Sequence, residues 1–409
     1  MEKMVGYEQA KKLIQGRVEM LPAELVDVHK SLGRALAEDA NALVSLPMTR
    51  VSLRDGYVLN SEESGPGKRF TVSGKILAGN PLTEPLAPGT AFWIVSQAVI
   101  PEGADAVVEE EKIKKYGNTI ELMDFVDTGG NVRALGEEFS EGELLLKKGA
   151  ILSEREVAFL LAAGHFELNV IRRPRTWVIA VGDELRHPGS VVRAGQEYPS
   201  AAWLLGMLAE ESGAELARVV IVEDACEAML EAMPLPESAD LVITVGGTGF
   251  GRRDIIEDLI KHLGAEMVFQ GVKMRPSHSF TFSMNQKQVI FSLPGRIDAA
   301  EIGFEFLARP GILKMQGKPT EHPAFIPARA LKELPGAGDQ AHVMRGVLTR
   351  KDGEIWVEPL KRKSWHKELA DADGLVIIEE NRSVVKAGEW VNFMVYRSHL
   401  PRMVANKYL

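Results

Sequence analysis

The clearest hydrophobic pattern in the chain is an alternation of strands and helices between residues 175 and 318. Apolar runs rich in β-branched residues predict buried strands, and amphipathic stretches predict the helices between them. The predicted strands are Trp177–Val181, Arg218–Val222 and Leu241–Val245. The predicted helices are Ala201–Glu211, Ala225–Met233 and Ile255–Leu263. Such alternation specifies a mostly parallel sheet with helices on both faces, which is a three-layer α/β/α domain.

The pattern changes on both sides of this region. Helical stretches are predicted at Tyr7–Ile14, at Val26–Leu36 and at Ser153–Ala163, where Ser153 and Glu156 have the spacing of a capping box. Between them, residues 70–126 form short strands separated by glycine and proline turns, which predicts an inserted, mostly-β module. The last 90 or so residues return to strands and turns. The chain is therefore predicted to be a multi-domain α/β protein with a small β-domain at its C-terminal end.

The strand Leu241–Val245 leads into Gly-Gly-Thr-Gly-Phe-Gly-Arg-Arg-Asp, residues 246–254. Glycines let the backbone turn sharply, and N–H groups near a helix N-terminus bind anions. Arg252 and Arg253 add positive charge, and Asp254 is expected to cap the next helix, hold a metal ion or carry a proton. An ordinary strand-to-helix turn is the alternative. Four glycines closed by Arg-Arg-Asp favour a phosphate or oxyanion site, although the spacing fits neither a Walker A loop nor a dinucleotide fingerprint.

Three further segments are expected beside this glycine loop. Ligands of such sheets bind at the carboxyl ends of the strands, so loops that follow the strands should share one rim. The segments are Gly182–Leu185, Lys273–Pro276 and Leu293–Arg296.

Composition and charge narrow the possible functions. The 409 residues are enough for two or more cores, and 45% hydrophobic with 26% charged residues is typical of a soluble globular protein. A net charge of −9 argues against non-specific nucleic-acid binding. The single cysteine, Cys226, excludes an intrachain disulfide and a cysteine-based zinc site. The N-terminus has no signal-peptide pattern, and no run approaches the about 20 apolar residues of a membrane span. We expect a cytoplasmic protein that binds no membrane.

Six segments, in the same order along the chain, resemble the MoeA-type molybdopterin molybdenumtransferases. Ser52–Tyr57 is similar to the family's Ser-Ala-Met-Asp-Gly-Tyr, and Gly182–Leu185 is similar to its Gly-Asp-Glu-Leu. Gly246–Asp254 is similar to Gly-Gly-x-Ser-x-Gly-x-x-Asp, and Leu293–Gly295 is similar to Leu-Pro-Gly. Any one match is weak, but six in the right order are specific. The matching segments are Ser52–Tyr57, Ala78–Gly79, Asn131–Arg133 with Gly136–Glu137, Gly182–Leu185, Gly246–Asp254 and Leu293–Gly295.

The resemblance implies a four-part chain. A helical linker region, residues 1–45 and 141–170, would carry a mostly-β module inserted over residues 46–140. An α/β molybdopterin-binding domain over residues 171–320 and a C-terminal β-barrel domain over residues 321–409 would follow. We expect the barrel to contribute no essential catalytic group.

The resemblance also implies an activity and partners. Members of this family insert molybdate into adenylylated molybdopterin and release AMP, and they require Mg²⁺. The family works as a homodimer in which the rim of one subunit faces the inserted module of the other. Other molybdenum cofactor biosynthesis proteins are the further partners that it suggests.

Residues can be assigned to this chemistry by their match to the family pattern. The expected catalytic residues are Asp55, Glu184 and Asp254, and Glu184 and Asp254 are also the expected Mg²⁺ ligands. Without the resemblance, Asp55 would be a solvated turn residue, Arg133 a surface cation and Glu184 a helix cap. The expected substrate-binding residues are Ser96, Arg133, Gly246, Gly247, Thr248, Gly249, Gly251, Arg252, Arg275, His278, Pro294, Gly295 and Arg296.

The chain departs from the family pattern at the anion site. Arg275 and His278 stand in a segment that carries two lysines in the family. Arginine offers a planar fork rather than a point charge, and histidine is a cation only when protonated. Ala201 stands where an asparagine is usual, and Arg296 replaces the asparagine of the family's Asn-Pro.

Two alternative functions therefore stay open. The first is a non-catalytic paralogue that binds a pterin, a nucleotide or a partner protein, which the lost lysines favour. The second is adenylyl transfer to molybdopterin, because the loop around Thr248 also resembles the MogA-type adenylyltransferases. The retained Asp55, Arg133, Glu184 and Asp254 favour an active molybdenumtransferase. The choice between molybdate and tungstate is open as well.

Overall fold

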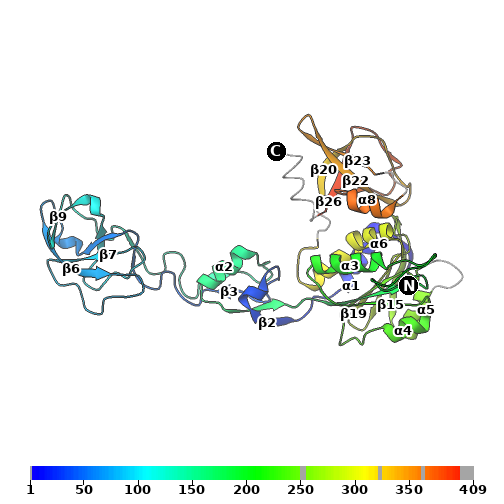
Figure 1. Ribbon diagram of the computed structural model, residues 1–409, viewed down its shortest axis with the longest axis horizontal. Helices are drawn as coiled ribbons and strands as arrows, with labels where there is room; N and C mark the ends of the chain where they lie inside the picture. The colour runs from blue at the N-terminus through cyan, green and yellow to red at the C-terminus, as the bar shows by residue number, and fades with distance from the viewer. Residues whose placement is uncertain (1, 249–254, 321–324, 361–363, 397–409) are drawn as a thin grey trace. The chain divides into compact units, whose positions relative to one another are not determined.

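The computed structural model describes residues 2–248, 255–320, 325–360 and 364–396. The chain forms two compact units (Figure 1). One unit comprises Met1–Glu24 with Ile171–Leu409, and the other comprises Leu25–Val170. The predicted four-part division is finer than this, and its boundaries stay predictions.

The unit Leu25–Val170 contains the predicted mostly-β module. Its six-stranded sheet has the order β8-β5-β7-β6-β10-β9 and carries hydrophobic clusters that include Tyr57 and Val58, neighbours that point to opposite faces. The short strands predicted within residues 70–126 are present as β6, β7, β8, β9 and β10. The bounds are β5 Gly56–Leu59, β6 Arg69–Ile76, β7 Thr90–Ile94, β8 Ala106–Val108, β9 Ile113–Tyr116 and β10 Thr119–Leu122.

Two helices were predicted in this unit outside the sheet, and the structure confirms one of them. Helix α2 (Glu154–Ala162) begins with the predicted capping box, in which the Ser153 N–H donates to Glu156 Oε2 at 2.8 Å. The helix predicted over Val26–Leu36 is wrong, because strand β2 (Ala23–Asp27) and a single 3-10 turn occupy it. Gly33 has φ of +73°, which a right-handed helix does not allow. Two short strand pairs follow, β3 (Ala40–Asn41) with β12 (Leu144–Leu146) and β4 (Val51–Ser52) with β11 (Val132–Arg133).

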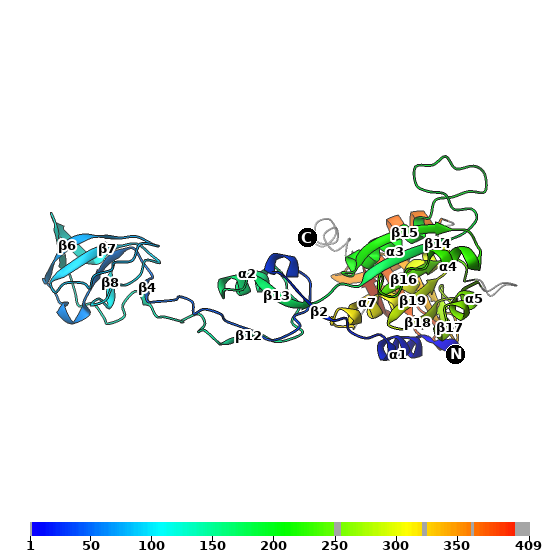
Figure 2. The same cartoon turned by 90° about the horizontal axis from the view of Figure 1, so that it is seen from below.

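In the other unit, the predicted mostly parallel sheet is confirmed (Figure 2). Strands β15, β14, β16 and β19 are parallel, and β18 is antiparallel to both of its neighbours. Strand β17 therefore runs in the same direction as β19, and all of these strands except β18 end at one rim. The bounds are β14 Arg175–Val181, β15 Glu215–Val222, β16 Leu241–Val245, β17 Glu266–Arg275, β18 Thr281–Asn285 and β19 Gln288–Leu293.

Helices cover both faces of this sheet (Figure 1). Helices α1, α3, α6 and α7 share one hydrophobic core with the sheet, and α4 and α5 share another. Every residue of β16 is buried because both faces are covered, as its continuous apolar sequence predicted. Strand β1 (Glu2–Gly6), which was not predicted, pairs in parallel with β17. The helix bounds are α1 Tyr7–Arg17, α3 Ser200–Glu211, α4 Cys226–Ala232, α5 Ile255–His262, α6 Ile297–Gly303 and α7 Arg309–Met315.

The C-terminal part of the same unit contains the predicted barrel. Its five strands close in the order β22-β23-β20-β26-β24, with β24 pairing back to β22. Strand β22 also pairs with β17, so the barrel is continuous with the α/β sheet. A short helix, α8 (Trp365–Asp371), contacts α6. The strand bounds are β20 Phe325–Ala330, β22 Ala341–Lys351, β23 Glu354–Pro359, β24 Gly374–Ile378 and β26 Trp390–Val395.

A buried ion pair connects the barrel to helix α6 of the α/β domain. The side chains of Glu301 in α6 and Arg345 in β22 are each 3% exposed, and Arg345 Nε donates to Glu301 Oε2 at 2.9 Å. The same guanidinium donates from Nη1 to the main-chain oxygen of Trp365 at 3.2 Å. Arg345 therefore connects Glu301 of α6 to the start of α8.

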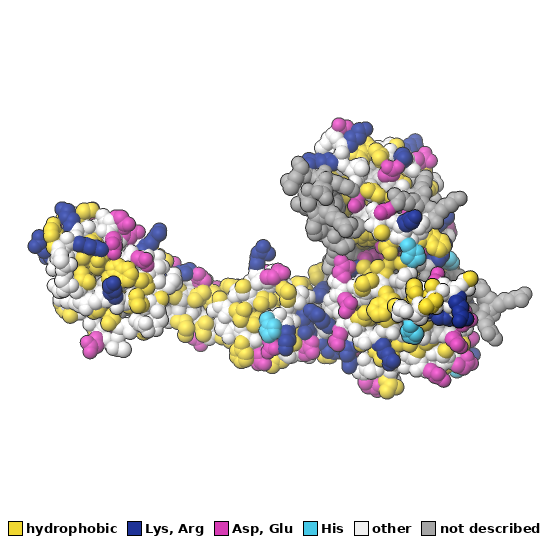
Figure 3. All heavy atoms as spheres, in the orientation of Figure 1, with side chains coloured by type: hydrophobic (Ala, Val, Ile, Leu, Met, Phe, Trp, Pro, Cys, Tyr) yellow, Lys and Arg dark blue, Asp and Glu magenta, His cyan; other side chains and the backbone are white. Residues whose placement is uncertain are grey.

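The surface mixes charges of both signs. On the face shown in Figure 3, basic and acidic side chains are interspersed over both units.

Candidate functional site

The rim at the carboxyl ends of the parallel strands brings three of the predicted segments together. Strands β14, β16 and β19 end at Val181, Val245 and Leu293, and cross-strand registers place these ends side by side. The Gly246 N–H donates to the Leu293 oxygen at 3.0 Å, which joins two of the turns directly. The prediction that these loops share one rim is therefore confirmed.

Gly246 occupies a position that only glycine fits without strain. Its φ is +96°, and that of Gly247 is +67°, so both lie in the left-handed region. A Cβ on Gly246 would lie 2.4 Å from the main-chain oxygen of Val181. The glycine turn is packed against the end of β14, and this contact sets the shape of the rim.

A pocket of about 430 Å³ lies at this rim. Backbone and hydroxyl groups meet in it, and the hydroxyls of Thr248 and Ser279 lie 3.1 Å apart. Such groups can bind an oxyanion without carrying a charge of their own. The lining residues are Val181, Gly182, Glu184, Asp224, Gly246, Gly247, Thr248, Pro276, Ser277, His278, Ser279, Pro294, Gly295, Arg296 and Ala299.

Carboxylates occupy one part of this pocket. Glu184 folds back over Gly182, whose Cβ, if present, would lie 2.7 Å from the Glu184 oxygens. The Asp224 N–H donates to Asp183 Oδ1 at 3.0 Å, which fixes the turn after β15. Burial raises the pKa of the Asp224 carboxyl, and the negative charges of Asp183 and Glu184 raise it further. Asp224 and Glu184 together form an electronegative corner where a cation would be stabilised.

Arg296 is the one arginine among the described residues that line the two rim pockets. It forms a bidentate pair with Asp298, at 3.0 Å from Nε and 2.5 Å from Nη2. Its guanidinium also lies 4.6 Å from the centre of the Trp365 ring. Arg296 lines both the pocket above and a second one of about 280 Å³, which share Val181, Glu184 and Gly295 as well.

The structure places some predicted residues elsewhere or does not describe them. Arg275 ends β17 as an exposed residue whose register partner is His342 of β22, and it lines neither rim pocket. His278 is exposed and lines the rim pocket of about 430 Å³. Gly249, Gly251, Arg252 and Asp254 lie outside the described residues.

Three predicted residues belong to the unit Leu25–Val170. The Ser96 N–H donates to Asp55 Oδ1 at 2.7 Å, so the Asp55 carboxylate closes the turn after β4. Arg133 in β11 pairs with Glu138 at 2.6 Å and lies 3.7 Å from Glu137. Asp55 and Ser96 are thus in direct contact, and the β4–β11 pair joins the Arg133 strand to the same region.

Sequence reasoning missed several residues at the rim pockets, among them Tyr198, Asp224, Ser279, Trp365 and His366. Asp224 follows a predicted strand, so the rule that located the other loops would also have located it. Trp365 and His366 line the smaller pocket from α8 of the C-terminal domain. No local signal in the sequence linked α8 to the rim, because the contact depends on how the barrel packs.

Comparisons with known proteins agree with this architecture. Family sequence models match the MoeA N-terminal region (domain I and II) at residues 5–164, a probable molybdopterin binding domain at residues 177–314 and the MoeA C-terminal region (domain IV) at residues 327–396. Together they leave only short stretches of the chain unmatched.

Individual relatives match over nearly the whole chain. The molybdopterin molybdenumtransferase of Haemophilus influenzae is 28% identical over 398 residues, which cover 95% of this chain and 98% of that protein. The Staphylococcus aureus protein of the same name is 28% identical over 96% of each chain. Two crystal structures of MoeA proteins from Pyrococcus horikoshii match with TM-scores of 0.82 and 0.75, at 25% and 23% identity. Each covers 96% of this chain, and the matches span 99% and 100% of those chains.

Within the described residues, no helix combines the length and the hydropathy needed to cross a bilayer.

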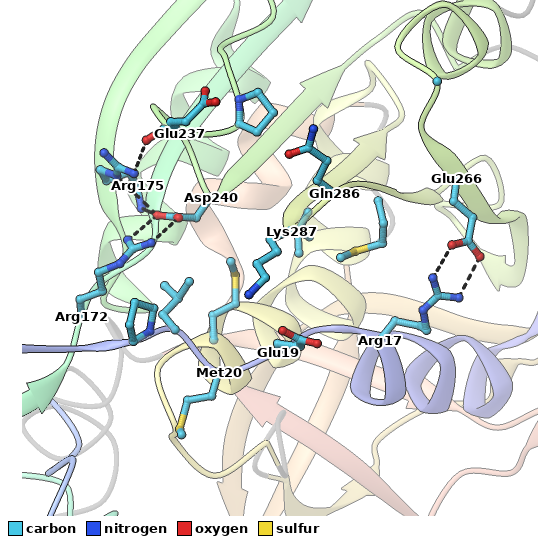
Figure 4. Close-up of a pocket in the computed structure, with 17 residues that line it drawn as sticks. Arg17, Glu19, Met20, Arg172, Arg175, Glu237, Asp240, Glu266, Gln286 and Lys287 are labelled. Atoms are coloured by element: carbon cyan, nitrogen blue, oxygen red, sulfur yellow. Dashed lines mark hydrogen bonds and ion pairs between the residues drawn. The ribbon is translucent and has the colours of Figure 1, made fainter.

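A larger pocket, of about 630 Å³, lies at the opposite edge of the sheet, where the parallel strands begin (Figure 4). Arg172 forms a bidentate pair with Asp240 on one side of it, and Arg17 donates to Glu266 at 2.8 Å on the other. These guanidinium groups are paired with carboxylates, as Arg296 is with Asp298 at the rim, so pairing does not distinguish the two sites. The smaller rim pockets, with their glycine turn and hydroxyl groups, have the better features of an anion site.

The ion pair at Asp240 predicts a pH-dependent stability. Burial raises the pKa of Asp240, but hydrogen bonds from the Arg172 side chain and the Arg175 N–H, with the charges of both arginines, outweigh burial and lower it. A lowered pKa means that the ionised pair stabilises the fold above about pH 4 and that this stabilisation is lost as the pH falls through the folded-state value. Asp240→Asn should therefore lower the free energy of unfolding at neutral pH by about 2 to 4 kcal/mol.

Urea unfolding, followed by tryptophan fluorescence, measures this difference. The gap between parent and Asp240→Asn should shrink as the pH is lowered below about 4. Glu237→Gln is the matched control, because Glu237 lines the same pocket and offers Arg175 only its main-chain oxygen. A gap that is the same at every pH would show that the charge of Asp240 contributes nothing.

Proposed function

The chain belongs to the MoeA family, and we infer from this that it is a molybdopterin molybdenumtransferase of molybdenum cofactor biosynthesis. The reaction inserts molybdate into adenylylated molybdopterin and releases AMP. One observation carries the inference beyond family membership. The Gly246–Gly247 turn, Glu184 and Arg296 line a single rim pocket in the part of the chain that matches the molybdopterin binding domain.

The chemistry of this pocket suits a phosphoanhydride and an oxyanion. We propose that the N–H groups of Gly247 and Thr248 and the Arg296 guanidinium bind the phosphates, because such donors stabilise negative charge in a partly enclosed site. The Gly246 N–H holds the turn on Leu293 instead. The hydroxyls of Thr248 and Ser279 are suited to the oxyanion, molybdate. Pro294 and Gly295 shape the turn beside them, and Gly249, Gly251 and Arg252 would extend the same loop.

The carboxylates fit a magnesium site of the kind that nucleotide enzymes use. Mg²⁺ takes oxygen ligands and is held by one or two carboxylates together with phosphate oxygens. Glu184 and Asp224 both line the pocket, and Asp254 is the second ligand that the family pattern assigns. When bound, Mg²⁺ would neutralise charge on the phosphoanhydride. We therefore propose that Glu184 and Asp254 hold it, with Asp224 beside them.

The segment with Arg275 and His278, which carries two lysines in the family, is the next part of the proposed site. We propose that Arg275 and His278 take over the cation roles of that segment. His278 lines the pocket, which supports a direct contact with the oxyanion. Arg275 lies at the end of β17 beside the barrel, so it would act on a ligand that extends beyond the pocket.

A homodimer is the assembly that best combines the two sets of residues. Asp55, Ser96 and Arg133 lie in one compact unit and the rim residues in the other. We propose that the rim of one subunit works with the Asp55 region of a second copy. Light scattering at working concentration should give the mass of a dimer, and a monomer that is fully active would refute this arrangement.

The remaining expectations follow from the family function. We propose a cytoplasmic protein that exchanges its pterin substrate and product with other molybdenum cofactor biosynthesis proteins. The two alternative functions, a non-catalytic paralogue and adenylyl transfer to molybdopterin, are not favoured by the comparisons.

AMP release tests the proposed activity directly. Purified protein is incubated with adenylylated molybdopterin, Mg²⁺ and molybdate, and AMP is measured over time. The parent should release AMP in a molybdate-dependent manner. Glu184→Gln should slow the release about 10²- to 10⁴-fold, because it removes a charge at the reacting phosphates while keeping the side-chain shape. Asp254→Asn should behave similarly.

Glu223→Gln provides the matched control. Glu223 precedes Asp224 in the same turn but lines neither rim pocket, so its variant should match the parent. A parent that binds the nucleotide tightly and releases no AMP would favour the non-catalytic paralogue instead.

A further inference from the structure

The smaller rim pocket is bordered by residues of two domains. Helix α8 of the C-terminal domain supplies Trp365 and His366, and the segment before α3 supplies Tyr198. Trp365 is 46% exposed and Tyr198 is 43% exposed, so both rings keep much of their surface open. The pocket of about 280 Å³ meets the larger pocket at Arg296, which lines both.

Trp365 is held in place from two sides. Arg345, fixed by its buried pair with Glu301, donates from Nη1 to the Trp365 oxygen at 3.2 Å. The next residue, His366, lies with Nε2 3.0 Å from the Ser200 hydroxyl at the start of α3. A side chain whose backbone is anchored in this way loses little freedom on binding, which favours affinity.

The position of Trp365 relative to Arg296 indicates what kind of ligand the pocket takes. The guanidinium lies 4.6 Å from the indole centre, within cation–π range. The Asp298 pair uses Nε and Nη2 of Arg296, so an anion bound through Nη1 would have an aromatic surface next to it. A planar ring attached to a phosphate group matches this pair, because aromatic side chains stack on heterocyclic bases while arginine pairs with phosphate.

We propose that Trp365 and Tyr198 bind one planar nitrogen heterocycle of the substrate, with Arg296 at the adjoining phosphate. This assignment rests on the proposed function, since adenylylated molybdopterin carries a heterocycle on each side of its phosphoanhydride. The larger of the two rim pockets, of about 430 Å³, then takes the oxyanion and the rest of the substrate. The C-terminal barrel domain is thereby a contributor to substrate binding, although the reacting groups lie on the α/β rim.

The test compares Trp365→Ala and Trp365→Phe with a matched tryptophan. Trp390 in β26 is 47% exposed and lies 4.3 Å from Arg329 in an equivalent cation–π pair, but it lines neither rim pocket. Trp390→Ala is therefore the control. Calorimetry measures binding of three probes, AMP, 6-hydroxymethylpterin monophosphate and molybdate, and turnover is followed by AMP release.

We expect Trp365→Ala to weaken binding of one ring-bearing probe on the order of tenfold and to leave molybdate binding unchanged. Trp365→Phe should retain most of the affinity because it keeps a ring. In turnover, the KM should rise while kcat stays near the parent value, as expected when binding is lost equally from ground and transition states. Trp390→Ala should match the parent throughout.

The probes separate the two ends of the substrate. Weaker AMP binding places the adenine in this pocket, and weaker binding of the pterin probe alone places the pterin there; either result supports the proposal. The proposal is overturned if the parent releases AMP while Trp365→Ala binds both ring probes as the parent does. It is also overturned if Trp365→Phe is as defective as Trp365→Ala and molybdate binding falls with it, because Trp365 would then only position Arg296. A parent that binds neither ring probe and releases no AMP would instead refute the proposed function.

Discussion

The contact between Gly246 and the end of β14 is the constraint on which the rim depends. A left-handed backbone at Gly246 lets the glycine turn lie directly against the Val181 oxygen, at a place where a Cβ would approach to 2.4 Å. The Gly246 N–H also donates a hydrogen bond of 3.0 Å to the main-chain oxygen of Leu293 at the end of β19, which holds the turn in position. Three strand ends are thus brought together without bulky side chains between them, and Glu184, Asp224 and Arg296 can face one pocket.

The Glu301–Arg345 ion pair joins the C-terminal barrel to helix α6. The Glu301–Arg345 pair is almost fully removed from water, and a buried charge that loses its partner is strongly destabilising. Because α6 starts directly after Arg296, this pair relates the barrel to the residue that lines both rim pockets. The pair therefore links two domains, and its arginine also contacts α8 through the Trp365 main-chain oxygen.

Much of this fold could be predicted from local sequence, because periodicity and turn chemistry are local properties. Strand β16 has the predicted bounds, Leu241–Val245, and the Ser153 capping box is present. The errors arise where tertiary contacts decide. The Val26–Leu36 segment has apolar spacing that suits a helix, yet it forms β2 and a 3-10 turn. Trp365 and the β17–β22 pairing beside Arg275 depend on docking of a domain distant in sequence, so no local pattern could indicate them.

The central claim, that the glycine turn creates the catalytic pocket, is tested most directly by the rate of AMP release from Gly246→Ala. The control is Gly264→Ala, because Gly264 also has positive φ, +63°, but a Cβ there meets nothing within 4 Å. Gly264→Ala carries a left-handed backbone cost of about 1 kcal/mol with no steric overlap. Gly246→Ala adds the overlap with the Val181 oxygen and a φ of +96° that lies further from the left-handed region open to alanine. The account predicts at least an order-of-magnitude slower release from Gly246→Ala and near-parental release from Gly264→Ala. Parental release from a folded Gly246→Ala protein would contradict it.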